Sequence, residues 1–148
     1  MILLYIILLV AVFFDIRTFR IPNRLILFGL GGRIWYYLWM PQKQTLLFYI
    51  FSMAAMFILL IPVYRLHAIG GGDVKLLSLC AAFTGLRSGL SIAVGALCFG
   101  GIFSILYLVY HHNISKQITK DRHVIHFSIP ILCGVVTEKI WGGFLWLT

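Results

Sequence analysis

Two aspartates, Asp15 and Asp73, each lie at the edge of a long apolar stretch in a chain that has four acidic residues in all. A carboxylate next to lipid is costly, so such a residue is a functional hypothesis by default. Two carboxylates that share one proton can activate water and polarise a peptide carbonyl at the same time. The pair therefore predicts an aspartic hydrolase if the fold brings the two residues together. This chemistry needs no cofactor and no metal, and we expect neither.

The first aspartate is followed by a proline-containing turn, Asp15-Ile16-Arg17-Thr18-Phe19-Arg20-Ile21-Pro22-Asn23. Pro22 disfavours helix at Ile21, and Asn23 can cap a new helix. We therefore expect Asp15 to end one helix and Asn23 to open the next. A helix C-terminus carries partial negative charge and disfavours an aspartate, so an incidental interfacial acid is a weak explanation of Asp15.

The second aspartate follows three glycines, in the run Gly70-Gly71-Gly72-Asp73-Val74-Lys75. Glycines allow a sharp turn and a close approach of another chain segment. Aspartate is a favoured N-cap, so simple capping is an alternative interpretation of Asp73. A phosphate-binding loop is disfavoured, because the Lys-Ser/Thr pair of such loops is absent. A helix N-terminus favours an anion, and we therefore expect Asp73 to be the more acidic member of the pair.

Together, the two motifs resemble those of the type IV prepilin leader peptidases, which are membrane aspartic peptidases with a GxGD signature. Gly70-Gly71-Gly72-Asp73 matches that signature, and Val74-Lys75-Leu76-Leu77 matches the residues that usually follow it. The family's other aspartate motif is matched by Asp15 with Ile21-Pro22-Asn23. The resemblance implies that Asp15 and Asp73 are catalytic, with supporting residues Gly70, Gly72, Lys75, Ile21, Pro22 and Asn23. A later stretch, His126-Phe127-Ser128-Ile129-Pro130, faintly resembles a proline-containing stretch of the family.

By the same resemblance, the substrate is a prepilin or pseudopilin of a type IV pilus or secretion system. The resemblance implies an endopeptidase that removes the short basic leader at the cytoplasmic boundary of a prokaryotic inner membrane. Many bacterial members also carry a cytoplasmic segment with paired CxxC motifs that is linked to N-methylation of the cleaved pilin. The three cysteines of this chain, Cys80, Cys98 and Cys133, show no such spacing. We therefore expect a peptidase-only form without N-methylation.

The elements that position these residues are expected to be membrane helices. Of the 148 residues 61% are apolar and 11% are charged, and lipid-exposed backbone must satisfy its own hydrogen bonds. The sequence predicts one all-α domain over residues 1–148, a bundle of six transmembrane segments at Ile2–Ile16, Leu25–Met40, Thr45–Tyr64, Val74–Leu86, Ser88–Tyr110 and Val124–Ile140. The first segment lacks a basic n-region and a small-residue cleavage site, so we interpret it as a retained span. The fourth is short enough to be re-entrant.

The basic residues predict how the bundle is oriented. If all six segments span, one side of the membrane carries Arg17, Arg20, Arg24, Arg65, Lys75, Lys116, Lys120 and Arg122, and the other carries Lys43, Arg87 and Lys139. This positive-inside bias places Asp15 and Asp73 at the cytoplasmic boundary and both termini on the extracytoplasmic side. A re-entrant fourth segment would remove the bias. Arg33, within the second segment, is expected to be paired inside the bundle or to snorkel outward.

Other function classes are weighed against the peptidase. The net charge of +8 is found in short gaps between apolar segments, so we expect anionic lipid of the inner leaflet as a partner and no nucleic acid. A transporter or proton-relay protein also uses intramembrane acids. That alternative is disfavoured because Asp15 and Asp73 share one side and no acid lies midway across. A non-catalytic assembly factor of a pilus or secretion system stays open.

Overall fold

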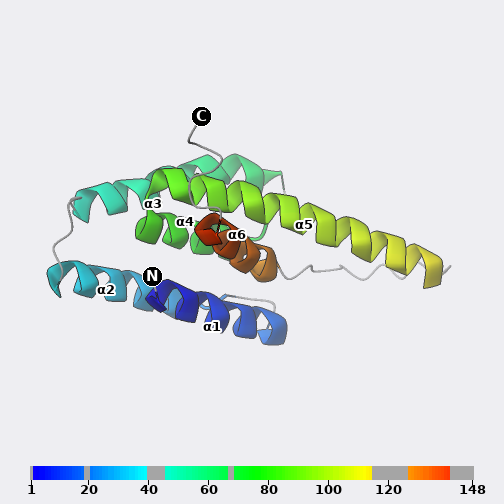
Figure 1. The fold of residues 1–148 in the computed structure, drawn as a ribbon, viewed down its shortest axis with the longest axis horizontal. Helices are drawn as coiled ribbons and strands as arrows, with labels where there is room; N and C mark the ends of the chain where they lie inside the picture. The colour runs from blue at the N-terminus through cyan, green and yellow to red at the C-terminus, as the bar shows by residue number, and fades with distance from the viewer. Residues whose placement is uncertain (1, 19–20, 40–45, 67–68, 115–126, 141–148) are drawn as a thin grey trace.

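A computed structural model of the chain describes residues 2–18, 21–39, 46–66, 69–114 and 127–140. These residues form six α-helices and no strand (Figure 1), which confirms the all-α prediction for this part of the chain. The helices are α1 (Ile2–Thr18), α2 (Asn23–Trp39), α3 (Leu46–Arg65), α4 (Gly71–Thr84), α5 (Leu86–Ile114) and α6 (Ser128–Ile140).

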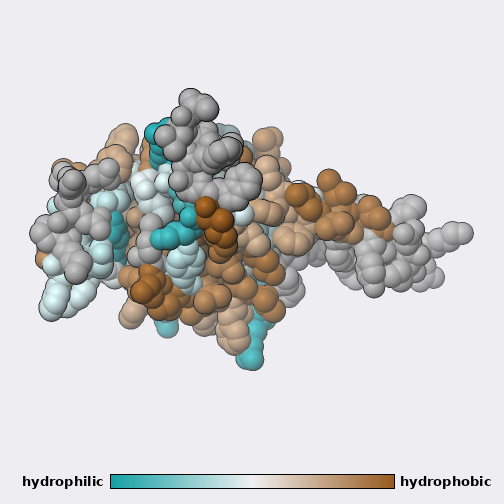
Figure 2. Space-filling model, in the orientation of Figure 1, coloured by the Kyte–Doolittle hydropathy of each residue, from teal (hydrophilic) through white to brown (hydrophobic). Residues whose placement is uncertain are grey.

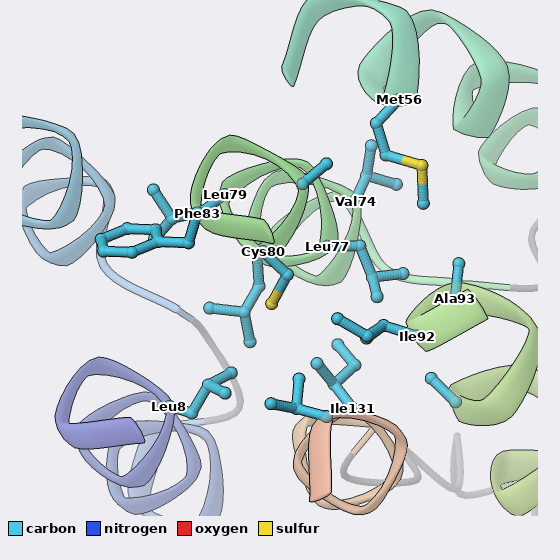
Figure 3. Packing of buried hydrophobic residues seen from close by; sticks show 14 of the residues in the cluster. Leu8, Met56, Val74, Leu77, Leu79, Cys80, Phe83, Ile92, Ala93 and Ile131 are labelled. Carbon is cyan, nitrogen blue, oxygen red and sulfur yellow. The ribbon is translucent and has the colours of Figure 1, made fainter. Parts of the chain in front are cut away.

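The short helix α4 lies in the middle of the bundle. Its 14 residues cover about 21 Å, less than the roughly 30 Å of a hydrocarbon core. Val74 and every residue of the stretch 76–83 are buried. Side chains of the surrounding helices, including Leu8, Met56, Ile92 and Ile131, point toward α4 (Figure 3). Protein therefore covers α4, and a helix too short to cross lipid alone can occupy this position.

A single glycine separates α4 from α5. Gly85 has a φ of 89°, a left-handed conformation that favours glycine, and its N–H donates to the carbonyl of Ala81 at 2.8 Å. Because one residue makes the turn, α5 begins at Leu86, two residues before the predicted Ser88. A Cβ atom added to Gly89 would lie 2.6 Å from the Cβ of Ala81, so the two helices pack here with almost no space between them.

The outer faces of the longer helices are apolar. Within the described residues, Leu46–Arg65 and Leu86–Leu106 are the two stretches long and apolar enough to cross a membrane. Only 22% and 28% of them is buried, whereas the core helix of a soluble protein is mostly buried. Exposed side chains such as Phe51, Ile58 and Ile105 add to the apolar surface, which extends along the protruding part of α5 (Figure 2). This distribution suits contact with lipid.

Arg33 holds the end of α4 that lies away from Asp73. The side chain is buried, and its Nε donates to the carbonyl of Ala82 at 3.3 Å. Its guanidinium lies 4.0 Å from the ring centroid of Tyr49 and 5.7 Å from that of Phe83, which are cation–π distances. The prediction of an arginine paired inside the bundle is confirmed.

Several sequence predictions concern residues outside the described ranges. These are the loop cations Arg20, Lys43, Lys116, Lys120 and Arg122, the helix edges Met40 and Thr45, and residues 124–126 of the sixth predicted segment. The described part of the sixth helix begins at Ser128.

Candidate active site

Asp15 lies in the last turn of α1 and is buried, with 7% of its surface exposed. The helix continues past the predicted end at Asp15 as far as Thr18. The hydroxyl of Thr18 supports this extra turn by donating to the carbonyl of Phe14 at 2.8 Å. A second hydroxyl, that of the fully buried Ser128 at the start of α6, donates to Oδ2 of Asp15 at 2.6 Å. The carboxylate is therefore held from a helix distant in sequence.

Asp73 lies in the first turn of α4, and Gly70 occupies the N-cap position. The interpretation of Asp73 as the N-cap residue is therefore wrong. The backbone N–H of Asp73 donates to the carbonyl of Gly70 at 3.1 Å, and the carboxylate of Asp73 accepts from the backbone N–H of Gly70. An acidic residue that reaches back in this way is half of a capping box. The helix begins earlier than predicted because this reciprocal pair stabilises its first turn.

The two sequence motifs touch each other at this end of the bundle. A Cβ atom added to Gly72 would lie 3.3 Å from the Cβ of Ile21, so the glycine lets the backbone of α4 approach the turn before α2. Nζ of Lys75 donates to Oδ1 of Asn23 at 2.9 Å. Asn23 is the first residue of α2, and its side-chain oxygen binds Lys75. The expected use of that side chain as a helix cap is therefore replaced by a contact between helices.

The turn between α1 and α2 completes this end. The N–H of Leu25 donates to the carbonyl of Pro22 at 3.0 Å, so the proline stands at the entry of α2 as its fixed φ favours. The residues that the sequence singled out are thus gathered at one end, which we call the site end: Asp15, Ile21, Pro22, Asn23, Gly70, Gly72, Asp73 and Lys75.

Electrostatics link the two aspartates. Asp73 lies outside the two stretches that qualify as membrane spans. The pKa of Asp73 is raised from 3.8 to about 7: burial is the largest cause, the charge of Asp15 adds to it, and the N–H of Gly70 offsets part of the rise. The carboxylates are therefore near enough to interact, and the protonated form of Asp73 is favoured more than in a free side chain. The raised pKa runs opposite to the effect expected of a helix N-terminus, because the loss of water outweighs the helix dipole.

Sequence reasoning missed Ser128 as a member of this site. It was noticed only as part of a faint proline-containing resemblance, because a lone serine beside an apolar segment carries no chemical signal. Helix polarity offered one: in the predicted topology of six alternating segments, the sixth begins on the side where the first ends, so its first polar residue is expected at the level of Asp15. Among the described residues, no cluster of three His, Cys, Asp or Glu side chains could hold a metal ion.

Comparison with known proteins agrees with this geometry. A sequence model of the type IV leader peptidase family matches residues 2–105, which is more than half of the chain. The matched stretch contains both aspartates and leaves α6 outside. No match was found among curated proteins or among solved structures. The chain belongs to the type IV leader peptidase family.

Proposed function

We propose that this protein is an aspartic endopeptidase that removes the short basic leader of type IV prepilins or pseudopilins, without N-methylating the product. One observation carries the proposal: the two aspartate motifs, from different helices, meet at the site end, where Gly72 packs on Ile21 and Lys75 binds Asn23, and the charge of Asp15 acts on Asp73. The family match supports prepilin-type substrates, and the interacting carboxylates supply a chemistry for cutting them.

The proposed reaction divides the labour between the carboxyl groups. Asp73, whose pKa of about 7 favours the protonated form below neutral pH, hydrogen-bonds the scissile carbonyl oxygen. Asp15, which accepts a hydrogen bond from Ser128, acts as the base and takes a proton from the attacking water. The water oxygen bonds to the carbonyl carbon, and the carbonyl oxygen takes the proton of Asp73. Collapse of this diol intermediate breaks the C–N bond: one hydroxyl returns its proton to Asp73 as the new carboxyl group forms, and the amine leaves with the proton held by Asp15.

We further propose that the six helices span a prokaryotic inner membrane as one domain, with both termini extracytoplasmic. The charges of the described residues support this orientation: Arg17, Arg24, Arg65 and Lys75 belong to helix ends that meet at the site end, whereas Arg87 and Lys139 belong to the opposite ends. Cations favour the cytoplasmic side. The site then lies at the inner boundary, where a basic leader joins its apolar stem, and anionic lipid there offsets the positive charge of both proteins.

The test is leader removal from a tagged prepilin co-expressed with the chain and followed on a gel. Asp15→Asn and Asp73→Asn keep side-chain size and remove the acid, and each is expected to lower the cleavage rate by at least about 100-fold. Glu138→Gln is the matched control, because it neutralises a carboxylate near the far end of α6, and it should cleave like the wild type. Each variant is first shown to accumulate in the membrane.

Two results would contradict the proposal. A wild-type protein that accumulates but leaves the leader in place would favour the transporter or the assembly factor. Cleavage that survives either Asp→Asn change would remove the shared-proton mechanism.

A further inference from the structure

The hydrogen bond between Ser128 and Asp15 joins two buried groups. Ser128 is fully buried, Asp15 is 7% exposed, and the Oγ–Oδ2 distance is 2.6 Å. O–H···O⁻ bonds fall between about 2.5 and 2.7 Å, and they are roughly twice as strong as bonds between neutral groups. Screening by water is small at such a site, so the contact has a large effect on the carboxylate.

The backbone of α6 is placed firmly enough to deliver this hydroxyl. The N–H of Ile131 donates to the carbonyl of Phe127 at 3.2 Å, which forms the first turn around Ser128. One helical turn further along, Gly134 packs directly on α5: an added Cβ would lie 2.7 Å from the carbonyl oxygen of Ile92. The position of Ser128 is therefore set by close helix packing, and its side chain meets Asp15 from a fixed direction.

Several helices near Asp15 carry charged groups. The described ones are Arg17 on α1, Arg24 and Arg33 on α2, Asp73 and Lys75 on α4, and Glu138 and Lys139 on α6. Asp73 repels a negative charge on Asp15. Lys75 binds Asn23, Arg17 lies over the ring of Phe13, and Arg33 lies at the opposite end of α4. The hydroxyl of Ser128 is one group that offsets the repulsion that Asp73 exerts on Asp15.

We infer that Ser128 is a positioning residue of the peptidase, whose hydroxyl orients the carboxylate of Asp15 and stabilises its negative charge while it activates water. This inference rests on the proposed function. It assigns a role to α6, which lies beyond the residues matched by the family, 2–105. It also explains why a hydroxyl rather than an apolar group fills a fully buried position at the start of an apolar helix.

The test uses the full chain, purified in detergent, with a tagged prepilin as substrate. The cleavage rate is measured from about pH 5 to about pH 9. Ser128→Ala is expected to lower kcat by about 10- to 100-fold with little change in KM, as for loss of a hydrogen bond to a charged group. The acidic limb of its pH profile should move to higher pH, because a carboxylate that loses a donor is protonated more readily. Ser128→Thr, which keeps the hydroxyl, should restore the position of that limb.

Ser52→Ala is the matched control. Ser52 is as deeply buried, and its hydroxyl donates to the carbonyl of Phe48 at 2.7 Å, away from the site. This change should leave the pH profile in place even if it lowers stability. If Ser128→Ala does not fold, the infrared carboxylate band of isotope-labelled Asp15 is compared in the wild type and in Ser128→Cys, whose thiol is a weaker donor of similar size, together with Asp15→Asn to assign it. A band indifferent to the hydroxyl at this position would overturn the inference.

The outcomes separate this inference from the function beneath it. A wild type that cleaves, Asp→Asn variants that do not, and Ser128→Ala with unaltered kcat and pH limb would overturn the role of Ser128 alone. A wild type that does not cleave, or Asp→Asn variants that do, would overturn the proposed function itself.

Discussion

Lys75 and Asn23 join the two aspartate motifs through a hydrogen bond of 2.9 Å between Nζ and Oδ1. Asn23 is the first residue of α2 and Lys75 is the fifth of α4, so the bond holds the start of α2 against the second turn of α4. Asp73 lies two residues before Lys75, and the turn from Asp15 ends at Asn23. The spacing of the two carboxyl groups therefore depends on this contact as well as on the apolar core below it.

Lys75→Met removes the ammonium group and keeps most of the aliphatic side chain. We expect kcat/KM to fall by about 3- to 10-fold, the equivalent of one partly exposed hydrogen bond, because the two motifs lose their link. Prepilin cleavage by purified protein measures this. Arg24→Met removes a positive charge from the same end and leaves the bond intact. An equal loss in both variants would mean that charge, rather than the link, is responsible.

Gly70→Ala tests the contact between the N-cap and Asp73. The added Cβ would lie 2.9 Å from Oδ2 of Asp73, so the carboxylate must move, and the φ of −74° at Gly70 lets alanine adopt the backbone without strain. A displaced catalytic group costs about 10- to 100-fold in kcat. Gly71→Ala, whose Cβ would meet a ring carbon of Tyr64 at 3.4 Å, should cleave normally. Similar rates for the two variants would contradict the placement of Asp73.

Alanine substitutions at two glycines of α5 should affect the free energy of unfolding differently. Gly89→Ala places a Cβ 2.6 Å from the Cβ of Ala81, and overpacking of this kind costs about 1–3 kcal/mol of unfolding free energy. Nothing lies within 4 Å of the Cβ position at Gly101. Gly101→Ala is therefore expected to be neutral or to add up to about 1 kcal/mol through helix propensity. Unfolding of the purified variants in detergent measures both, and a stabilised Gly89→Ala would refute the tight α4–α5 contact.

The raised pKa of Asp73 predicts how stability depends on pH. Because the pKa rises from 3.8 to about 7 on folding, the folded state binds the proton more tightly than the unfolded state. The resulting stabilisation, at most about 4 kcal/mol, is fully present below the unfolded pKa and is lost as pH rises through the folded one. The Asp73→Asn variant has no carboxyl group at this position, so it does not lose this stabilisation as the pH rises. Its stability relative to the wild type should increase between pH 4 and pH 8, a window that brackets the two values.

The same protonation governs activity. If Asp73 must hold a proton to polarise the carbonyl, cleavage should decline as pH rises past about 7. A cleavage rate that keeps rising above that pH would show that the ionised form of Asp73 is the active one.

The helices were predictable wherever an apolar run is long and ends at a proline or a glycine. The predicted segment Thr45–Tyr64 and the proline before Asn23 agree with the positions of α3 and α2 within one or two residues. The start of α4 was not predictable in the same way, because three glycines usually indicate a turn. In the folded chain, Gly71 and Gly72 are helical, and the backward reach of the Asp73 carboxylate to Gly70 depends on that local geometry.

The site was predictable as far as its acids carry a sequence signature. Asp15 and Asp73 were identified by their unfavourable surroundings and by their motifs. The Ser128–Asp15 and Lys75–Asn23 hydrogen bonds were not predictable, because they join residues 113 and 52 positions apart in the sequence. A contact of this kind depends on the rotation of one helix against another, which packing decides and no local pattern records.

The dependence of Asp15 on α6 has a consequence for how the enzyme is made. A chain leaving the ribosome carries both aspartates long before it carries Ser128. Under the proposed role of that serine, full hydrolytic activity is reached only after the last described helix has entered the bundle. A half-synthesised protease in the membrane then works well below its final rate, and biosynthesis itself keeps proteolysis slow until assembly is finished.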